Sequence, residues 1–234
     1  MKDKIVVFAP HPDDEVLGCG GTIARRLSEG YDVLVVFLTD GRYSLAQIDV
    51  PLQPSPIELK EIRKEEAKKA AKMLGVPERN LIFFDIEDGI LEQNRSMAQD
   101  LIAKVLESSP TEIYFPQEKE FNLDHRAANH LVRDAIRKLD LHTLEYQYMI
   151  AWLYPLNLIP RLRPQRLQDT FVSMILGQEV IHIDVSEFLS LKKAALEEYQ
   201  SQLSILSDKQ RRPALKDSFV KRFLKNKEDF VRRQ

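Results

Sequence analysis

The chain has 234 residues, 44% of them hydrophobic and 30% charged, which is typical of a globular protein of one domain or at most two. Its 34 Lys and Arg residues against 36 Asp and Glu give a net charge of −2 and no positive field that would hold nucleic acid. The single cysteine, Cys19, excludes an internal disulfide and a cysteine-based metal cluster.

Apolar stretches long enough for a signal peptide or a membrane span are missing from the sequence. The N-terminal apolar run covers only residues 5–9, and the longest strictly apolar stretch, residues 33–38, is far below the roughly 18 residues of a span. Together with the lone cysteine, this predicts a cytoplasmic protein without a transmembrane segment.

Short apolar runs alternate with segments of helical periodicity through the first 139 residues. The runs are continuous and rich in Val, Ile, Leu and Phe, which is typical of strands buried on both faces. They cover residues 5–9, 33–39, 81–86 and 112–115. Apolar residues three and four positions apart predict helices over residues 22–29, 56–74, 94–108 and 124–139. This order predicts an α/β fold with a doubly wound, mostly parallel sheet flanked by helices, which binds ligands beyond the carboxyl ends of its strands.

The remaining residues, 143–234, are expected to extend the same domain whose core is 1–142. Strands are predicted at 145–154 and 180–185, with a third candidate at 171–176, and Ser186 is the predicted N-cap of a helix over 186–206. The segment 155–166, rich in Pro and Arg, is either a connecting loop or a lid over a site. The basic stretch 209–234 carries three Phe residues at helical spacing, which predicts a surface helix.

A dense group of potential metal ligands and bases follows the first predicted strand. It contains His11, Asp13, Asp14 and Glu15, at the edge of the sheet where this architecture binds ligands. The alternative is that Asp13 or Asp14 simply caps the next helix. One cap needs one carboxylate, whereas this group has three acids beside a histidine, so we favour the functional interpretation.

A second group, Asn122, Asp124 and His125, follows the fourth predicted strand. The first and fourth strands of a doubly wound sheet are often neighbours, so we expect both groups to share one crevice. His11, Asp14 and His125 would then supply two imidazoles and one carboxylate, the ligand set of an open, catalytic zinc site, with another divalent cation as the alternative.

The other acids of the two groups have predicted roles beside that metal. Zinc would lower the pKa of a bound water from ~15.7 to about 7, and Asp13 is the expected general base for this water. Asp124 is expected to orient a ligand ring or the loop by hydrogen bonding.

A dinucleotide-binding fingerprint is the main rival interpretation, because Gly18, Gly20 and Gly21 follow a strand and open a helix. The third glycine of that fingerprint would fall where Ile23 stands, so we attribute the glycines to close packing instead.

At these residues the chain resembles the LmbE-like, or PIG-L, family of zinc-dependent N-deacetylases. The similar motifs are residues 9–15, 18–21, 39–41, 88–89 and 124–125, with further likeness around residues 63–76 and 192–202. The resemblance implies a Rossmann-like fold, His11, Asp14 and His125 as metal ligands, and Asp13 as the base. It also implies that the substrate is a small N-acetylated sugar or glycoconjugate of the N-acetylglucosamine type.

Two positions depart from the family pattern. Asn122 stands where a histidine usually helps to stabilise the oxyanion; its amide can donate an N–H but cannot change protonation, so Asp13 would also protonate the departing amine. Tyr199 stands where histidine is common. These departures support an alternative, a non-catalytic metal- or sugar-binding protein.

One residue outside the two groups is a candidate for substrate contact. Arg63 lies early in the predicted helix 56–74, and its alternative role is a surface ion pair. The sequence leaves the oligomeric state open, and a homo-oligomer is compatible with it.

Overall fold

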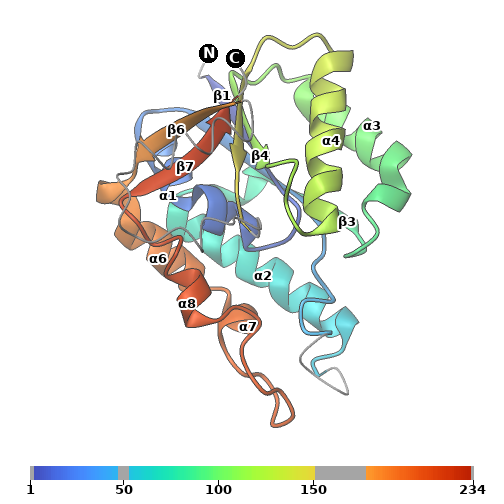
Figure 1. Ribbon diagram of the computed structural model, residues 1–234, viewed down its shortest axis with the longest axis vertical. Helices are drawn as coiled ribbons and strands as arrows, with labels where there is room; N and C mark the ends of the chain where they lie inside the picture. Colours follow the sequence, from blue (N-terminus) through green and yellow to red (C-terminus); the bar gives the residue numbers. More distant parts are fainter. Residues whose placement is uncertain (1–2, 47–52, 151–177, 233–234) are drawn as a thin grey trace.

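A seven-stranded sheet with the order β3-β2-β1-β4-β5-β7-β6 forms the centre of the computed structural model, which describes residues 3–46, 53–150 and 178–232 (Figure 1). Strands β1 to β5 run parallel, and β7 lies antiparallel between β5 and β6. The mostly parallel sheet predicted from the apolar runs is therefore confirmed. The strands are β1 Lys4–Ala9, β2 Asp32–Thr39, β3 Leu81–Ile86, β4 Glu112–Pro116, β5 Leu144–Tyr148, β6 Glu179–Asp184 and β7 Lys227–Arg232.

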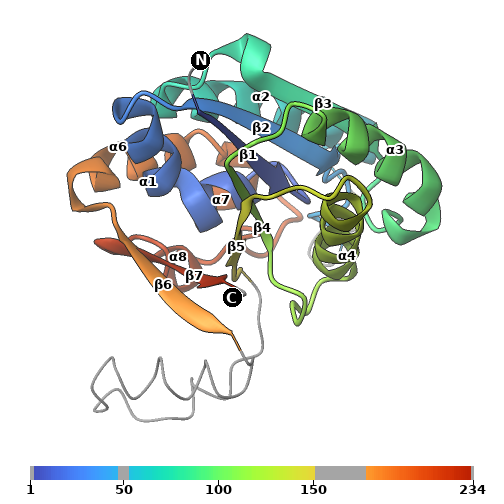
Figure 2. The same cartoon turned by 90° about the horizontal axis from the view of Figure 1, so that it is seen from above.

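Helices cover both faces of this sheet (Figure 2). The α-helices are α1 Asp14–Ser28, α2 Pro56–Leu74, α3 Arg95–Leu106, α4 Leu123–Lys138, α6 Leu189–Glu197, α7 Gln200–Leu203 and α8 Asp217–Val220. Short 3-10 helices cover Glu78–Asn80, Glu92–Asn94 and Ser186–Phe188. Helices α1, α2 and α6 pack on one face, and α3 and α4 pack on the other.

The central strand β1 shows why its residues are apolar without alternation. Ile5 and Val7 point into the core shared with α1 and α2, whereas Val6 and Phe8 point into the core shared with α3 and α4. Successive side chains of a strand lie on opposite faces, so a strand covered on both sides must be apolar throughout.

The topology brings the ends of β1 and β4 together. These strands pair in parallel, from Ile5 opposite Glu112 to Val7 opposite Tyr114. Their carboxyl ends, and the loops that lead into α1 and α4, therefore lie side by side. The predicted adjacency of the first and fourth strands is confirmed.

The glycines of the rival dinucleotide interpretation lie inside a helix. Helix α1 begins at Asp14 rather than at the predicted residue 22, so Gly18 and Gly21 are not part of a phosphate-binding loop. A Cβ on Gly18 would lie 2.6 Å from the Cδ2 atom of Tyr148, and one on Gly21 would lie 2.6 Å from the Cβ of Val185. The packing role predicted for these glycines is confirmed. Because glycine has a low helix propensity, the sequence did not indicate that the first turns of α1 are helical.

The predicted C-terminal surface helix is wrong. Residues 227–232 form β7, which completes the sheet, and only the four residues of α8 are helical nearby. Phe230 is fully buried and its ring packs edge-on against Tyr114, with ring centroids 5.2 Å apart. Glu228 is also buried. Its carboxylate accepts the N–H groups of Gly21 and Thr22 and forms an ion pair with Lys192, which compensates the buried charge. A charged residue at a buried position interrupts the apolar pattern by which a strand is predicted, so hydropathy did not indicate β7.

The predicted helix 186–206 is interrupted. Ser186 does not cap it: this residue lies in a 3-10 turn, and its N–H and hydroxyl both donate to Asp184. Helix α6 ends at Glu197, and Tyr199 separates it from α7. Strand β5 ends at Tyr148, before the predicted end at 154. The predicted strand 171–176 and segment 155–166 lie outside the described residues, and the division into core and extension stays a prediction.

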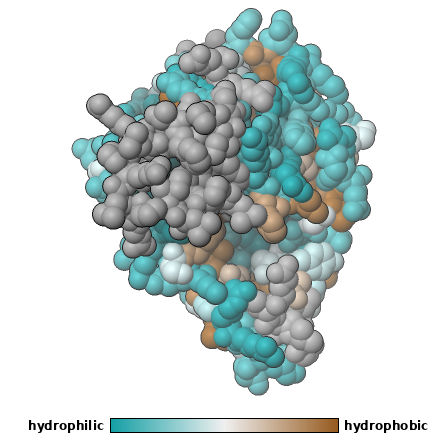
Figure 3. Space-filling model, in the orientation of Figure 1, coloured by the Kyte–Doolittle hydropathy of each residue, from teal (hydrophilic) through white to brown (hydrophobic). Residues whose placement is uncertain are grey.

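One face of the molecule shows the character of its described surface residues. On the face drawn in Figure 3, the described residues are largely hydrophilic, and the apolar areas are small and separate. Among the helices that the structure describes, none has the length and apolar character needed to cross a membrane.

Candidate metal centre and active site

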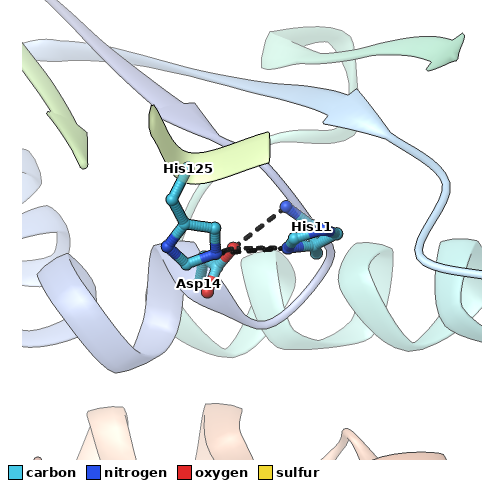
Figure 4. Close-up of side chains that lie close together, drawn as sticks. All are labelled: His11, Asp14 and His125. Carbon is cyan, nitrogen blue, oxygen red and sulfur yellow. Dashed lines mark hydrogen bonds and ion pairs between the residues drawn. The ribbon is translucent and has the colours of Figure 1, made fainter. Parts of the chain in front are cut away.

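Three potential metal ligands converge where β1 and β4 end (Figure 4). Oδ2 of Asp14 lies 3.1 Å from Nδ1 of His11 and 3.0 Å from Nε2 of His125, and these two nitrogens are 3.3 Å apart. Ligand atoms bound to one tetrahedral zinc ion at ~2.0–2.1 Å lie roughly 3.3 Å from each other. The three atoms thus have the spacing that one divalent cation requires, as the sequence predicted.

The loop after β1 holds Asp14 in this position. The backbone N–H of His11 donates to Oδ2 of Asp14 over 3.0 Å, so the same oxygen is fixed by a ring and by the backbone. His125 comes from the first turn of α4, 114 residues further along the chain. All three residues are buried, which keeps competing water away from the donor atoms.

Each histidine ring has a carboxylate on its other side. Nε2 of His11 lies 3.2 Å from Asp88 and 3.4 Å from Asp124, and Nδ1 of His125 lies 3.5 Å from Glu120. Metal-bound histidines in proteins usually face such a carboxylate or a carbonyl, which fixes the ring and raises its basicity. This arrangement fits a metal centre, and the predicted role of Asp124 in orienting a ring agrees with its position.

His11, Asp88 and Asp124 also lie close enough together to hold a cation. Both oxygens of Asp124 already accept backbone N–H groups, from Gly89 at 2.7 Å and Leu91 at 3.1 Å. One oxygen of Asp88 accepts the N–H of Tyr43. We therefore interpret these two carboxylates as supports that connect His11 to the loop after β3.

The electrostatics of the cluster favour a positive ion. Burial lowers the pKa of His125, but the adjacent Asp14 and Glu120 outweigh this effect and raise the pKa to about 9. Burial raises the pKa of Asp14, but His125 and His11 hold it well below the usual range. Buried carboxylates need compensating charge, and a divalent cation bound here would supply it.

Asp13 is buried beside the ligand group but is not part of it. Its backbone has φ of 124°, a region that costs a residue with a side chain ~1–3 kcal/mol. Its Oδ2 lies 3.1 Å from the guanidinium of Arg63. Burial raises the pKa of Asp13 to about 7, although Arg63 opposes this rise. A carboxylate with such a pKa is suited to proton transfer near neutral pH.

Arg63 is enclosed by the loops of the site. It is only 2% exposed, so the alternative of a surface ion pair is wrong. Its guanidinium donates to the carbonyl oxygens of Gly41, at 2.8 Å, and Pro12. Contact between Arg63 and a substrate stays a prediction; the observed contacts hold Asp13 and the loops.

Asn122 is exposed at the start of α4. Its side-chain oxygen accepts the N–H of Asp124 over 2.8 Å and so caps the helix that carries His125. The amide nitrogen, which the oxyanion role requires, takes no part in this cap.

Sequence reasoning missed two contributors to the site. Glu120, only 1% exposed, faces His125, and no motif or periodicity distinguishes it from other acids near strand ends. Tyr199, which departs from the family pattern, lies inside the molecule, where its hydroxyl donates to Glu15. Burial raises the pKa of Glu15 to about 8, although the hydroxyl of Tyr199 opposes this rise.

Replacing Asp124 with asparagine tests its supporting role. We expect Asp124→Asn to weaken the affinity for a divalent cation by about 10- to 100-fold, because an uncharged amide cannot replace the two negative oxygens that face His11 and the backbone of residues 89–91. Competition with a chromogenic chelator measures the affinity. The matched control is Asp134→Asn on the same helix, where the aspartate pairs with arginines. Equal affinities in the two variants would contradict this role.

Fold and site together define a Rossmann-like α/β protein with a buried His-Asp-His group. The chain belongs to the PIG-L family, described as GlcNAc-PI de-N-acetylase, which matches residues 6–136.

Named relatives share part of this region. Diacetylchitobiose deacetylase of Thermococcus kodakarensis is 30% identical over 155 residues, which are 65% of this chain and 56% of that protein. The 4-oxalmesaconate hydratase of Pseudomonas putida is 32% identical over 137 residues, 58% of this chain and 52% of that protein. The chain therefore spans a little over half the length of these relatives.

The solved structures support the same fold. The N,N'-diacetylchitobiose deacetylase of Pyrococcus horikoshii superposes with a TM-score of 0.67, covering 97% of this chain and 82% of that one. At 20% sequence identity, this likeness establishes the architecture. The predicted fold and family are both confirmed.

Proposed function

We propose that this protein is a zinc-dependent amide hydrolase that removes an N-acetyl group from an amino sugar or sugar conjugate of the N-acetylglucosamine type. The buried group of His11, Asp14 and His125, with Asp13 next to it, is the observation that carries the proposal. Membership of a de-N-acetylase family and the deacetylase among the relatives support the reaction type.

The residues of the site have distinct tasks in this proposal. A divalent cation held by the two histidines and Asp14 would supply Lewis acidity toward water and the acyl oxygen. Asp13 takes the proton of the attacking water and returns it to the nitrogen as the amide C–N bond breaks. Asn122 donates an N–H to the acyl oxygen while negative charge develops there. The products are acetate and a free amine.

Acetate release tests the proposal directly. The purified protein, loaded with Zn²⁺, is incubated with N-acetylglucosamine, its disaccharide and an N-acetylglucosamine glycoside, and acetate and free amine are both quantified. We expect equal amounts of the two products, loss of turnover with a chelator, and recovery with added Zn²⁺. Sugar binding without acetate would instead support the non-catalytic alternative.

The hydratase among the relatives gives a second candidate reaction, the addition of water to a carbon–carbon double bond. An unsaturated dicarboxylic acid in the same panel distinguishes the two reactions. Loss of its ultraviolet absorbance, without acetate release from any sugar, would replace the deacetylase proposal.

Asn122 offers a test of oxyanion stabilisation. We expect Asn122→Ala to lower kcat by about 10²- to 10³-fold through loss of the N–H donor. This variant also loses the α4 cap, which costs ~1 kcal/mol in the free energy of unfolding. Asn122→Asp is the matched control, because it keeps an oxygen for the cap but has no N–H to donate. If Asn122→Asp retains wild-type kcat, Asn122 is only a helix cap.

A further inference from the structure

The backbone of Asp13 is held in its unfavourable conformation by a buried side chain. The N–H of Asp13 donates to Oε2 of Glu15 over 3.0 Å, and Glu15 has no exposed surface. On the other side, the carbonyl oxygen of Asp13 accepts the N–H groups of Val16 and Leu17 at 3.1 and 2.9 Å. The direction of the Asp13 side chain therefore depends on where the Glu15 carboxylate is fixed.

Glu15 is fixed by a tyrosine from the other end of the chain. The hydroxyl of Tyr199 donates to Oε1 of Glu15, 184 residues apart in the sequence. Tyr199 is fully buried and lies between α6, which packs on α1 and α2, and α7, which packs on α2. Ser201, two residues further, donates its N–H and hydroxyl to Glu66 of α2 at 2.7 and 2.6 Å, which anchors this junction.

We propose that Tyr199 is a positioning residue for the catalytic base: through Glu15 it fixes the backbone, and hence the side-chain direction, of Asp13. The role of Asp13 as the catalytic base rests on the proposed function. The hydrogen bonds that connect Tyr199 to Asp13 through Glu15 do not depend on it. Tyr199 thus gives the C-terminal segment a role at the active site, although none of the proposed metal ligands comes from it.

The structure supplies a matched control for this chain of contacts. Tyr114 is also fully buried, and its hydroxyl donates to Glu112 over 2.6 Å. Glu112 is the first residue of β4, so this pair lies at the opposite end of the strand from the metal ligands. Tyr114→Phe and Tyr199→Phe each remove one buried hydroxyl bonded to a glutamate, but only the second removal loosens Glu15.

The test compares the two variants in the full-length, Zn²⁺-loaded protein. We expect Tyr199→Phe to lower kcat for deacetylation by about 10- to 100-fold, because Asp13 would no longer be held in its reactive position. KM and zinc content should change by less than about twofold. Tyr114→Phe should lower Tm similarly and keep wild-type kcat. Wild-type kcat in Tyr199→Phe, with the same loss of Tm as the control, would overturn the proposal.

Amide hydrogen exchange gives a readout that needs no activity. In ¹⁵N-labelled protein, we expect the Asp13 N–H to exchange faster in Tyr199→Phe than in the wild type, and at the wild-type rate in Tyr114→Phe. If the wild type releases no acetate, the proposed function fails, whereas the exchange rate still decides whether Tyr199 holds Asp13. An unchanged rate would overturn the positioning role.

Glu15→Gln provides a second variant in case Tyr199→Phe does not fold. Glutamine keeps only one acceptor oxygen, because its NH2 group can donate but not accept. Either the Asp13 N–H or the Tyr199 hydroxyl therefore loses its acceptor, and the loss of kcat should match that of Tyr199→Phe. The two changes combined should cost no more than either alone, because they interrupt one chain of contacts. Additive losses would show that the residues act separately and would contradict the proposal.

Discussion

Replacing His125 with alanine is expected to remove both the bound metal and turnover. His125 offers one of the three candidate donor atoms, and its Nε2 lies 3.0 Å from Oδ2 of Asp14 and 3.3 Å from Nδ1 of His11. Two remaining ligands would leave an incomplete coordination sphere, since catalytic zinc sites use three protein ligands. Losing the metal removes about 4 kcal/mol or more of transition-state stabilisation, which corresponds to roughly 10³-fold in kcat/KM.

Metal content and acetate release, measured on the same preparation, check this expectation. His130→Ala is the matched control: it changes the same residue type on the same helix, but His130 is exposed and does not belong to the ligand group. The control should keep wild-type zinc and activity. Full zinc content in His125→Ala would contradict the assignment of His125 as a ligand.

Asp13→Asn is expected to separate metal binding from catalysis. Asparagine has nearly the same size as aspartate but cannot accept the proton of the attacking water, so kcat should fall by ~10²- to 10⁴-fold. Zinc content should be unchanged, because Asp13 is not part of the ligand group. Asparagine also tolerates positive φ, which limits the effect on the backbone of this residue.

The control for Asp13→Asn is the same substitution at Asp140. This aspartate also has positive φ, of 48°, but lies in the exposed turn after α4. Asp140→Asn should have wild-type kcat and zinc content. If Asp13→Asn also keeps wild-type kcat, Asp13 is not the base, and the strained backbone at this position needs another explanation.

Local patterns in the sequence were sufficient to predict the core of the fold. The strands next to the site are apolar on both faces, as Val6 and Val7 illustrate, and this pattern alone predicts a sheet covered by two helical layers. The convergence of the three candidate ligands was also predictable, because His11 and Asp14 follow one strand and His125 follows its parallel neighbour. Because these strands are neighbours in the sheet, the loops that follow them lie side by side, and residues distant in the sequence meet in one site.

Features that depend on a specific distant partner were not predictable. Strand β7 contains Glu228, whose carboxylate is buried only because Lys192 and the backbone of α1 lie opposite it. The contact of Tyr199 with Glu15 joins residues 184 positions apart, and no local sequence pattern at either residue indicates the other as its partner. Such pairs stabilise a buried charge through complementary placement, which hydropathy and periodicity do not encode.

Anomalous X-ray diffraction from crystals grown with zinc is the most direct measurement of whether this protein is built around a metal ion. Data collected above and below the zinc absorption edge would locate the ion independently of any assay. We expect one strong peak within bonding distance of Nδ1 of His11, Oδ2 of Asp14 and Nε2 of His125. A zinc-loaded protein with no peak there, or with its peak bound by other side chains, would contradict this expectation.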